Sequence, residues 1–346
     1  MDERAQYGGQ AVVEGVMMRS PHFFTVACRR LSTGEIVTQQ EPVEKTLRAV
    51  QWLNKPFLRG TLALIDAMAL GMKALTYAAN VQADDTSGEA KSEAPAAAAV
   101  GLAMGEGAPS APAPGKPSQT INGIAIGATT VVALLLGFGL FWTLPALVTD
   151  HLLKTHNRLG ANLFEGGVRL LVFFIYIGLI SRMAHVQRVF QYHGAEHKAI
   201  NALEANLPLT VENARGASRI HPRCGTNFIF IVLITAIVVF SVIPRHPFSE
   251  GLGPVLQTVG LRLLLLPVVA GIAFEILKWA GANRDKRWAQ ALIAPGLWTQ
   301  YLTTRVPDDS QIEVALVALR SVWDKEHEAA LSSLPTGEDE PAASVA

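Results

Sequence analysis

The sequence contains, at residues 133–142, the stretch ALLLGFGLFW, in which only Trp142 has a side chain that can form a hydrogen bond. This run lies inside a longer apolar stretch, Ile121–Val148. A helix needs roughly 20 mainly apolar residues to cross a bilayer core. Three further stretches have this character: Gly167–Ala184, Gly225–Ile243 and Val255–Ala280. The sequence therefore predicts a mainly α-helical, polytopic membrane protein with about four transmembrane helices, and its first partner is the lipid bilayer.

Composition agrees with a membrane protein. Of the 346 residues, 50% are hydrophobic and 17% are charged, and the mean hydropathy is +0.28. These values are too apolar for two ordinary soluble domains. The formal net charge is zero, and no strongly basic segment stands out. Nucleic acid is therefore excluded as a partner, because its binding needs a basic surface.

Charged residues between the apolar stretches indicate the orientation, since Lys and Arg near the ends of spans favour the cytoplasmic side. The loop after the second span and the segment after the fourth are the most basic. Both are expected in the cytoplasm, which places both termini there as well. The residues that carry this argument are Arg188, Lys198, Arg215, Arg219, Arg223, Lys278, Arg284, Lys286 and Arg287.

Composition and pattern divide the rest of the chain. The first residues of the chain alternate as strands around Ser32-Thr33-Gly34. Asp66 and Lys73 interrupt a fifth apolar stretch, and this pattern favours an interfacial or re-entrant helix. An Ala/Pro-rich stretch cannot bury enough apolar surface to fold. The expected units are a β-rich cytoplasmic element at 1–58, the interfacial or re-entrant helix at 59–82, a disordered linker at 83–120, the first two transmembrane helices at 121–184, a cytoplasmic loop at 185–224, the last two transmembrane helices at 225–280, a cytoplasmic helical segment at 281–325 and a disordered tail at 326–346.

The cytoplasmic loop contains the pentapeptide His193-Gly194-Ala195-Glu196-His197. Residues i and i+4 share one face of a helix, so both imidazoles can bind one metal ion. The spacing is the H-x-x-E-H pattern of zinc hydrolases. Glu196 beside them is the candidate general base, which would take a proton from a water molecule that the metal activates.

Two histidines do not complete a metal site, so a third ligand must come from elsewhere in the chain. Glu204 lies seven residues beyond His197, on the order of 10 Å along the helix axis, which is too far to share the metal. The open candidates are His221, Cys224, Glu212 and Glu275. His221 and Cys224 have H-x-x-C spacing, which suits zinc. If both join the two imidazoles, the coordination is closed and the metal is structural rather than catalytic.

Two other features have both a functional and a structural interpretation. The glycine-rich segment 8–19 carries the isolated Glu14 as a further candidate site residue, or it is a β element that packs on the membrane portion. Glu275 either reaches the metal or forms an ion pair with Arg262 or Lys278, and the pair with Lys278, one helical turn away, is the default.

Several blocks together resemble the YqhQ-like family. They are GGQAVVEGVMMR near the N-terminus, YHGAEHK, TVEN and SRIHPRCGT in the centre, and APGLW and TTRVPDDSQ near the C-terminus. The likeness covers about residues 7–80 and 120–323. This family is one of bacterial multi-pass membrane proteins described as predicted metal-dependent enzymes. The resemblance implies a bacterial inner membrane location, and it supports a metal-binding role for His193, His197, His221 and Cys224 with Glu196 beside them.

The sequence thus predicts an integral membrane protein that binds zinc or another divalent metal at its cytoplasmic face and hydrolyses a peptide or a lipid-linked bond. A membrane protein or peptide is the expected substrate. The alternative is a non-enzymatic membrane scaffold or regulator, in which a metal, where bound, only stabilises the loop. A transporter ranks third, because few polar groups within the spans line up as a pathway.

Overall fold

The structure is a computed structural model that describes residues 7–43, 55, 59–86, 132–133, 135–153, 157–242, 254–283 and 286–332. The N-terminal part is a small antiparallel sheet with strand order β1-β2-β3-β4. The strands are β1 (Gly8–Val12), β2 (Gly15–Arg19), β3 (Phe23–Arg29) and β4 (Ile36–Pro42). Gly34, with φ of +73°, allows the turn between β3 and β4. The β-rich element expected from the sequence is therefore confirmed.

Both faces of this sheet are covered by helices. Successive strand residues point to opposite faces, so Val16 and Met18 of β2 pack against α6 (Ala184–Glu204) and α11 (Asp309–Ser332). Met17, between them, packs on the other side against α1 (Arg59–Thr86). The short helix α7 (Val211–Gly216) packs on α6 and α11. The sheet, α6, α7 and α11 therefore form one unit, and they lie on the same side of any membrane that the chain crosses.

Another group of helices is mainly apolar. They are the π-helical turn η2 (Gly139–Thr143) continued by α4 (Leu144–Leu152), then α5 (Arg158–Ile180), α8 (Gly225–Ser241) and α9 (Pro254–Ala282). Among the residues that the structure describes, four segments are long and apolar enough to cross a membrane: Arg59–Asp85, Leu135–Leu152, Leu159–Ile180 and Gly260–Ala282. The chain is therefore a mainly helical membrane protein, as the sequence predicts.

Three of these four helices overlap stretches that the sequence analysis selected, whereas the stretches 225–243 and 59–82 differ from the prediction. The stretch 225–243 forms α8, a helix of 17 residues, which is shorter than the roughly 20 that a bilayer needs. The stretch 59–82, expected at the interface, lies in α1 and has the length and composition of a span. However, Leu70, Ala74 and Ala78 of α1 are buried against the sheet, so this face of α1 is occupied by protein.

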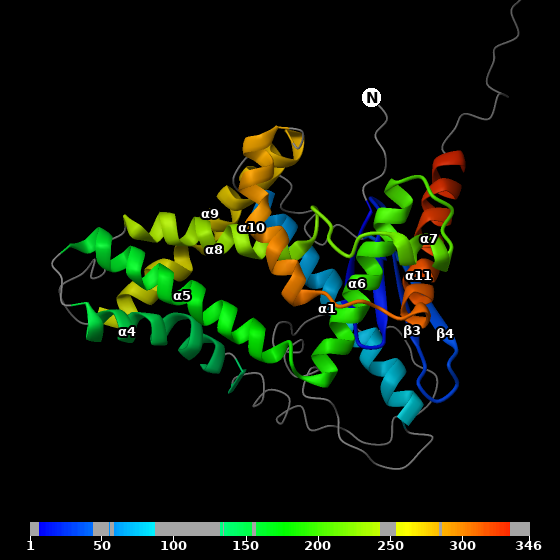
Figure 1. The fold of residues 1–346 in the computed structure, drawn as a ribbon, viewed down its shortest axis with the longest axis horizontal. Coiled ribbons are helices and arrows are strands. Elements are labelled where there is room, and N and C mark those ends of the chain that lie inside the picture. The colour runs from blue at the N-terminus through cyan, green and yellow to red at the C-terminus, as the bar shows by residue number, and fades with distance from the viewer. Residues whose placement is uncertain are drawn as a thin grey trace, which may run out of the picture.

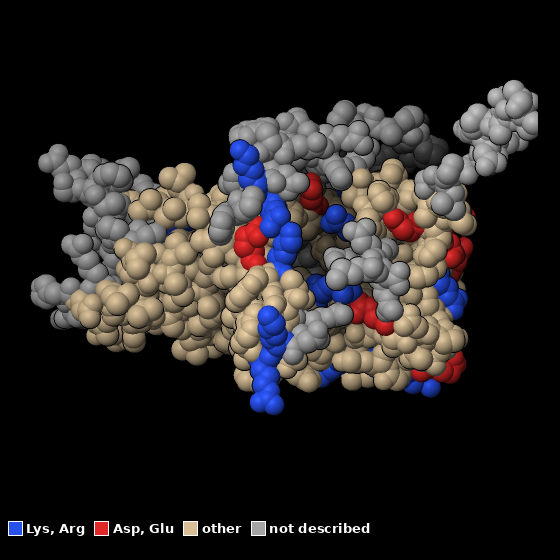
Figure 2. All heavy atoms as spheres, turned by 90° about the horizontal axis from the view of Figure 1, so that it is seen from above, with Lys and Arg blue, Asp and Glu red and all other residues tan. Residues whose placement is uncertain are grey.

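Figure 1 shows how these parts are arranged along the long axis of the molecule. Helices α4, α5, α8 and α9 occupy one end, and the sheet with α6, α7 and α11 occupies the other. Helices α1 and α10 (Arg287–Thr303) lie between the two ends. In the orthogonal view of Figure 2, the end formed by the apolar helices shows almost no charged side chains, whereas both signs of charge gather at the other end.

Charged residues within the long helices find partners that the sequence analysis did not predict. Glu275 forms a two-point ion pair with Arg59 of α1, with N–O distances of 2.7 and 2.6 Å. The expected pairing of Glu275 with Arg262 or Lys278 is therefore wrong. Arg262 instead pairs with Glu165 of α5, which also accepts a hydrogen bond from Arg169 at 2.8 Å. The three side chains are buried together, which reduces the cost of placing charge among apolar helices.

Some expected units fall largely outside the described residues. Helix α1 continues to Thr86, past the point at 83 where we expected a linker to begin, and residues 87–131 are not described. Helix α11 likewise continues to Ser332, beyond the predicted end of the helical segment at 325. The remainder of the predicted tail, 333–346, is not described.

Candidate metal centre

The pentapeptide lies in the middle of α6, where its histidines and glutamate share one face. One ligand atom each from His193, His197 and Cys224 lie within 4.8 Å of one another. The two imidazole rings have centroids 4.4 Å apart, as the i, i+4 spacing predicts. Cys224 is the N-cap residue of α8, and its Sγ lies 3.1 Å from Nε2 of His193. The third donor thus comes from the start of an apolar helix.

The orientation of both imidazoles is determined by backbone carbonyl groups. Nδ1 of His193 lies 2.8 Å from the carbonyl oxygen of Thr303, and Nδ1 of His197 lies 2.6 Å from that of Arg219. A carbonyl only accepts, so each Nδ1 carries the proton and each Nε2 presents a lone pair. Nε2 of His197 is buried without a hydrogen-bond partner among the described residues. An imidazole with Nδ1 bound to a carbonyl and Nε2 free is the usual arrangement of a metal-ligating histidine.

A strap of backbone between α7 and α8, residues 217–224, brings these groups to α6. Lys198 donates to the carbonyl oxygens of Arg215 and Ala217 at 2.7 and 2.6 Å. Asn201, one turn further along α6, donates to the carbonyl oxygens of Ser218 and Ile220. These hydrogen bonds tie the strap to the same helix that carries the histidines. They therefore hold the carbonyl group of Arg219 and the thiol of Cys224 in place.

Two glycines permit the close approach of other segments to α6. A Cβ on Gly194 would lie 2.1 Å from the carbonyl oxygen of Arg305. A Cβ on Gly9 in β1 would lie 2.7 Å from Cγ of Glu196. Because neither position has space for a methyl group, glycine allows the segment with Thr303 and the first strand to pack directly against the candidate site.

Glu196 faces the two imidazoles rather than solvent. Its Oε2 lies 3.7 Å from Nε2 of His197 and 3.9 Å from Nε2 of His193. Its side chain is 6% exposed. Burial raises the pKa of this carboxyl group, whereas His193, His221 and a hydrogen bond from the backbone N–H of Gly9 lower it, and burial outweighs them. Burial likewise lowers the pKa of His197, which favours the neutral, metal-binding form of the ring.

The structure separates the other candidate residues from this group. The ring of His221 lies 5.8 Å from that of His197, but its Nε2 is 3.2 Å from Glu204. Glu212 is exposed on α7, and Glu275 pairs with Arg59. Glu14 forms an ion pair with Arg188 and accepts a hydrogen bond from Tyr192 at 3.2 Å. Of the four third-ligand candidates, only Cys224 faces the two imidazoles.

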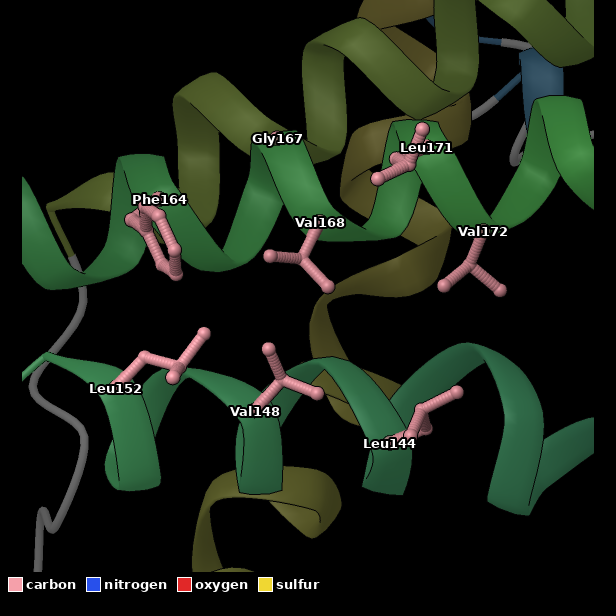
Figure 3. A pocket seen from close by; sticks show the side chains of 8 residues that line it. All are labelled: Leu144, Val148, Leu152, Phe164, Gly167, Val168, Leu171 and Val172. Atoms are coloured by element: carbon pink, nitrogen blue, oxygen red, sulfur yellow. The ribbon is translucent and has the colours of Figure 1, made fainter.

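A groove lies between two of the apolar helices. Figure 3 shows side chains of α4 and α5 that face one another across a groove. Its volume is about 530 Å³. The lining residues are all apolar, namely Leu144, Val148, Leu152, Phe164, Gly167, Val168, Leu171 and Val172. None of these lining side chains can bind a metal or transfer a proton.

Comparison with known proteins places this site in a family. Residues 55–325 match a family described as "Protein of unknown function (DUF1385)". The chain is also 34% identical over 311 residues, 90% of each chain, to "Uncharacterized protein YqhQ" of Bacillus subtilis (strain 168). The chain belongs to this family. The resemblance found from the sequence motifs is therefore confirmed. No solved structure matches the chain.

All three candidate metal donors and Glu196 lie within the residues that match the family. Gly9, which contacts Glu196, lies before the matched residues. Sequence reasoning missed the two carbonyl groups that orient the imidazoles, because any residue supplies a carbonyl oxygen. The glycines were a signal, since a glycine inside a helix or strand marks a close approach of backbone.

Proposed function

We propose that this protein is a metal-dependent hydrolase that acts at the membrane surface. The observation that carries the proposal is the convergence of two imidazole Nε2 atoms and one thiol sulfur within 4.8 Å, with a buried carboxylate beside them. Three protein donors leave one position of a tetrahedral site for water or substrate, as in catalytic zinc sites.

Zinc fits the donor set best. Its ligands in proteins are imidazole nitrogen and thiolate sulfur, whereas magnesium and calcium prefer oxygen. When bound, zinc would polarise a substrate carbonyl group and lower the pKa of water.

Glu196 is the proposed catalytic residue. Its Oε2 lies 3.7 and 3.9 Å from the two Nε2 atoms, so this carboxylate would be within reach of a water bound to a metal on these donors and would accept its proton. Water then adds to the carbonyl carbon of the substrate, and the bond to the leaving amine or alcohol breaks. Glu196 passes the proton to that leaving group. The reaction consumes one water and needs no other reactant.

The location of the site supports a substrate at or in the membrane. Cys224 stands directly before α8, whose residues from Gly225 to Ser241 are almost all apolar, so the metal donors lie at the end of an apolar helix. Basic residues near the site, including Arg219 and Arg223, favour the cytoplasmic side. We therefore place the site, the sheet and α11 in the cytoplasm of a bacterial cell, and the substrate is a membrane protein, a peptide or a lipid-linked compound.

Hydrolysis in ¹⁸O-labelled water tests the proposal. The full chain, purified in detergent, is assayed for zinc by elemental analysis and incubated with a bacterial membrane fraction. Mass spectrometry then identifies products with ¹⁸O in a newly formed carboxyl group. We expect Glu196→Gln to retain zinc and to reduce the labelling rate by about 10²- to 10⁴-fold, the usual contribution of a general base.

Glu212→Gln is the matched control, because this exposed glutamate of α7 should leave both zinc content and labelling unchanged. His197→Ala should lose zinc and labelling together. If Glu196→Gln labels as fast as the wild type, Glu196 is not the base. If zinc is bound but no labelled product forms, or if Glu196→Gln loses the metal, the metal is structural and the scaffold alternative holds.

A further inference from the structure

The adjoining ends of α9 and α10 carry an aromatic and basic surface that the metal centre does not use. Trp279, near the end of α9, stacks on Trp288, near the start of α10, with ring centroids 4.0 Å apart. Trp279 is nevertheless 59% exposed. Lys278, Lys286 and Arg287 beside them are exposed as well. A stacked indole pair surrounded by cations is a costly surface to leave in water, which indicates a partner.

Helix α10 extends this surface along its length. Trp288, Leu292, Trp298 and Leu302 are exposed, and their spacing places them on one side of the helix. The opposite side is buried and contains small or polar residues such as Gly296 and Gln300. A Cβ on Gly296 would lie 1.8 Å from Oδ1 of Asn227 in α8, which shows how closely this side packs. The apolar side of α10 thus points away from the protein.

The position of this surface identifies the partner. In Figure 2, Lys and Arg side chains form a column at the border between the end almost free of charge and the end that carries both signs. In Figure 1, the adjoining ends of α9 and α10 project sideways at this same border. Segments Leu159–Ile180 and Gly260–Ala282 have the length and composition of membrane spans, so the border corresponds to a bilayer surface.

The charge of the segment indicates which class of lipid it binds. Residues 278–302 include four basic residues and a single acidic one. Trp prefers the boundary between headgroups and acyl chains, and Lys or Arg near the surface attract anionic lipids. We propose that the adjoining ends of α9 and α10, residues 278–283 and 286–302, form an interfacial anchor that lies in the headgroup region of a bilayer and binds anionic phospholipids through Lys278, Lys286 and Arg287.

The anchor also keeps the metal centre near the membrane surface, and this part of the inference rests on the proposed function. The inner side of α10 holds the site, since the carbonyl oxygen of Thr303 binds Nδ1 of His193 and Gln300 forms two hydrogen bonds with the backbone of His221 at 2.9 and 2.8 Å. An α10 seated in the headgroup region therefore keeps the metal donors close to the membrane surface, where a bond just outside the bilayer can reach them.

Fluorescence quenching tests the depth of the anchor. The full chain is reconstituted in vesicles of phosphatidylcholine and phosphatidylglycerol that carry bromine either near the headgroups or near the chain ends. We expect stronger quenching by the shallow bromine, and we expect replacement of Trp279, Trp288 and Trp298 by Phe to remove most of this component. Trp323→Phe is the control, because Trp323 packs on Tyr7 in the sheet unit, with ring centroids 5.4 Å apart, away from lipid.

Lipid retention tests the charge preference. After partial delipidation, mass spectrometry measures the ratio of phosphatidylglycerol to phosphatidylcholine that stays bound. We expect each of Lys286→Gln and Arg287→Gln to lower this ratio by about fivefold, since one cation near the surface is worth about that much. Lys325→Gln is the control, because Lys325 of α11 pairs with Glu328 at 3.0 Å in the sheet unit.

Either of two results overturns the inference: equal quenching by the triple Phe variant and the wild type, or an unchanged lipid ratio in Lys286→Gln and Arg287→Gln. Zinc content is measured in every variant and is expected to stay constant. These lipid measurements do not depend on hydrolysis, so the anchor can fail while the hydrolase stands, and the reverse also holds.

Discussion

Gly194 stands between the candidate metal ligands His193 and His197, and the structure has no room for a larger residue there. A Cβ would lie 2.1 Å from the carbonyl oxygen of Arg305, whose own N–H donates to the carbonyl oxygen of Phe190 at 2.8 Å. Because this backbone is held to α6, it cannot move away easily. We predict that Gly194→Ala destabilises the protein by about 1–3 kcal/mol, the usual cost of overpacking, and weakens zinc binding. Thermal unfolding in detergent and competition with a chelating dye measure the two effects.

Gly178→Ala is the matched control for this substitution. Gly178 lies inside α5, and nothing lies within 4 Å of a Cβ built there. Alanine has the higher helix propensity, so this variant should be about 0.5–1 kcal/mol more stable than the wild type. Equal stability of the two alanine variants would contradict the packing that we describe around Gly194.

At the scale of elements, α11 is joined to the sheet by a partly buried carboxylate. Glu326 accepts a hydrogen bond from Oγ of Ser20 at 2.7 Å and contacts Nδ1 of His22 at 2.6 Å. Burial raises the pKa of Glu326, but the hydrogen bonds from Ser20 and His22 outweigh it, so the pKa is lowered. A carboxyl group with a lowered folded-state pKa stabilises the protein above its unfolded pKa, about 4.3, and this contribution is lost as the pH falls through the folded value.

We therefore predict that Glu326→Gln lowers the free energy of unfolding at pH 7 by about 1 kcal/mol and has a smaller effect at pH 4. Circular dichroism during thermal unfolding at the two pH values measures this. Glu328→Gln is the control, because its side chain is 68% exposed and pairs with Lys325 of the same helix. Such exposed ion pairs contribute little to the free energy of unfolding. If the stability of the two variants depends on pH in the same way, the contact of Glu326 with Ser20 and His22 does not join α11 to the sheet.

At the scale of the whole molecule, the candidate metal donors connect the two ends of the structure. His193 and His197 belong to α6 in the sheet unit, whereas Cys224 begins α8 in the apolar end. A ligand that binds only the folded state stabilises the whole fold. We predict that the unfolding temperature rises with free zinc, by an amount that corresponds to about 2.7 kcal/mol when zinc is 100-fold above its Kd, and that EDTA reverses the rise.

The histidines supply a matched pair of variants for this experiment. His197→Ala should abolish the zinc-dependent rise. His327→Ala should preserve it, because His327 is exposed on α11 and its Nδ1 contacts the carbonyl oxygen of Trp323 in the same helix. A full zinc-dependent rise in His197→Ala would mean that zinc binds somewhere other than at α6.

Features that depend on residues close together in the chain could be predicted from the sequence. Helical spacing placed His193 and His197 on one face of α6, and turn residues predicted the hairpin around Gly34. Thr210 is the N-cap of α7, and its side chain accepts a hydrogen bond from the N–H of Asn213. Such features follow from local geometry and hydrogen bonding, which the neighbouring residues decide.

Only the tertiary structure decided the contacts between distant segments. Cys224 faces His193 across 31 positions of chain, whereas His221, with the same zinc-like chemistry, faces Glu204. Arg262 finds Glu165 rather than Glu275. Several partners of equal chemistry were available in each case. The choice among them depends on how helices pack and how the strap between α7 and α8 closes, and these are properties of the whole fold.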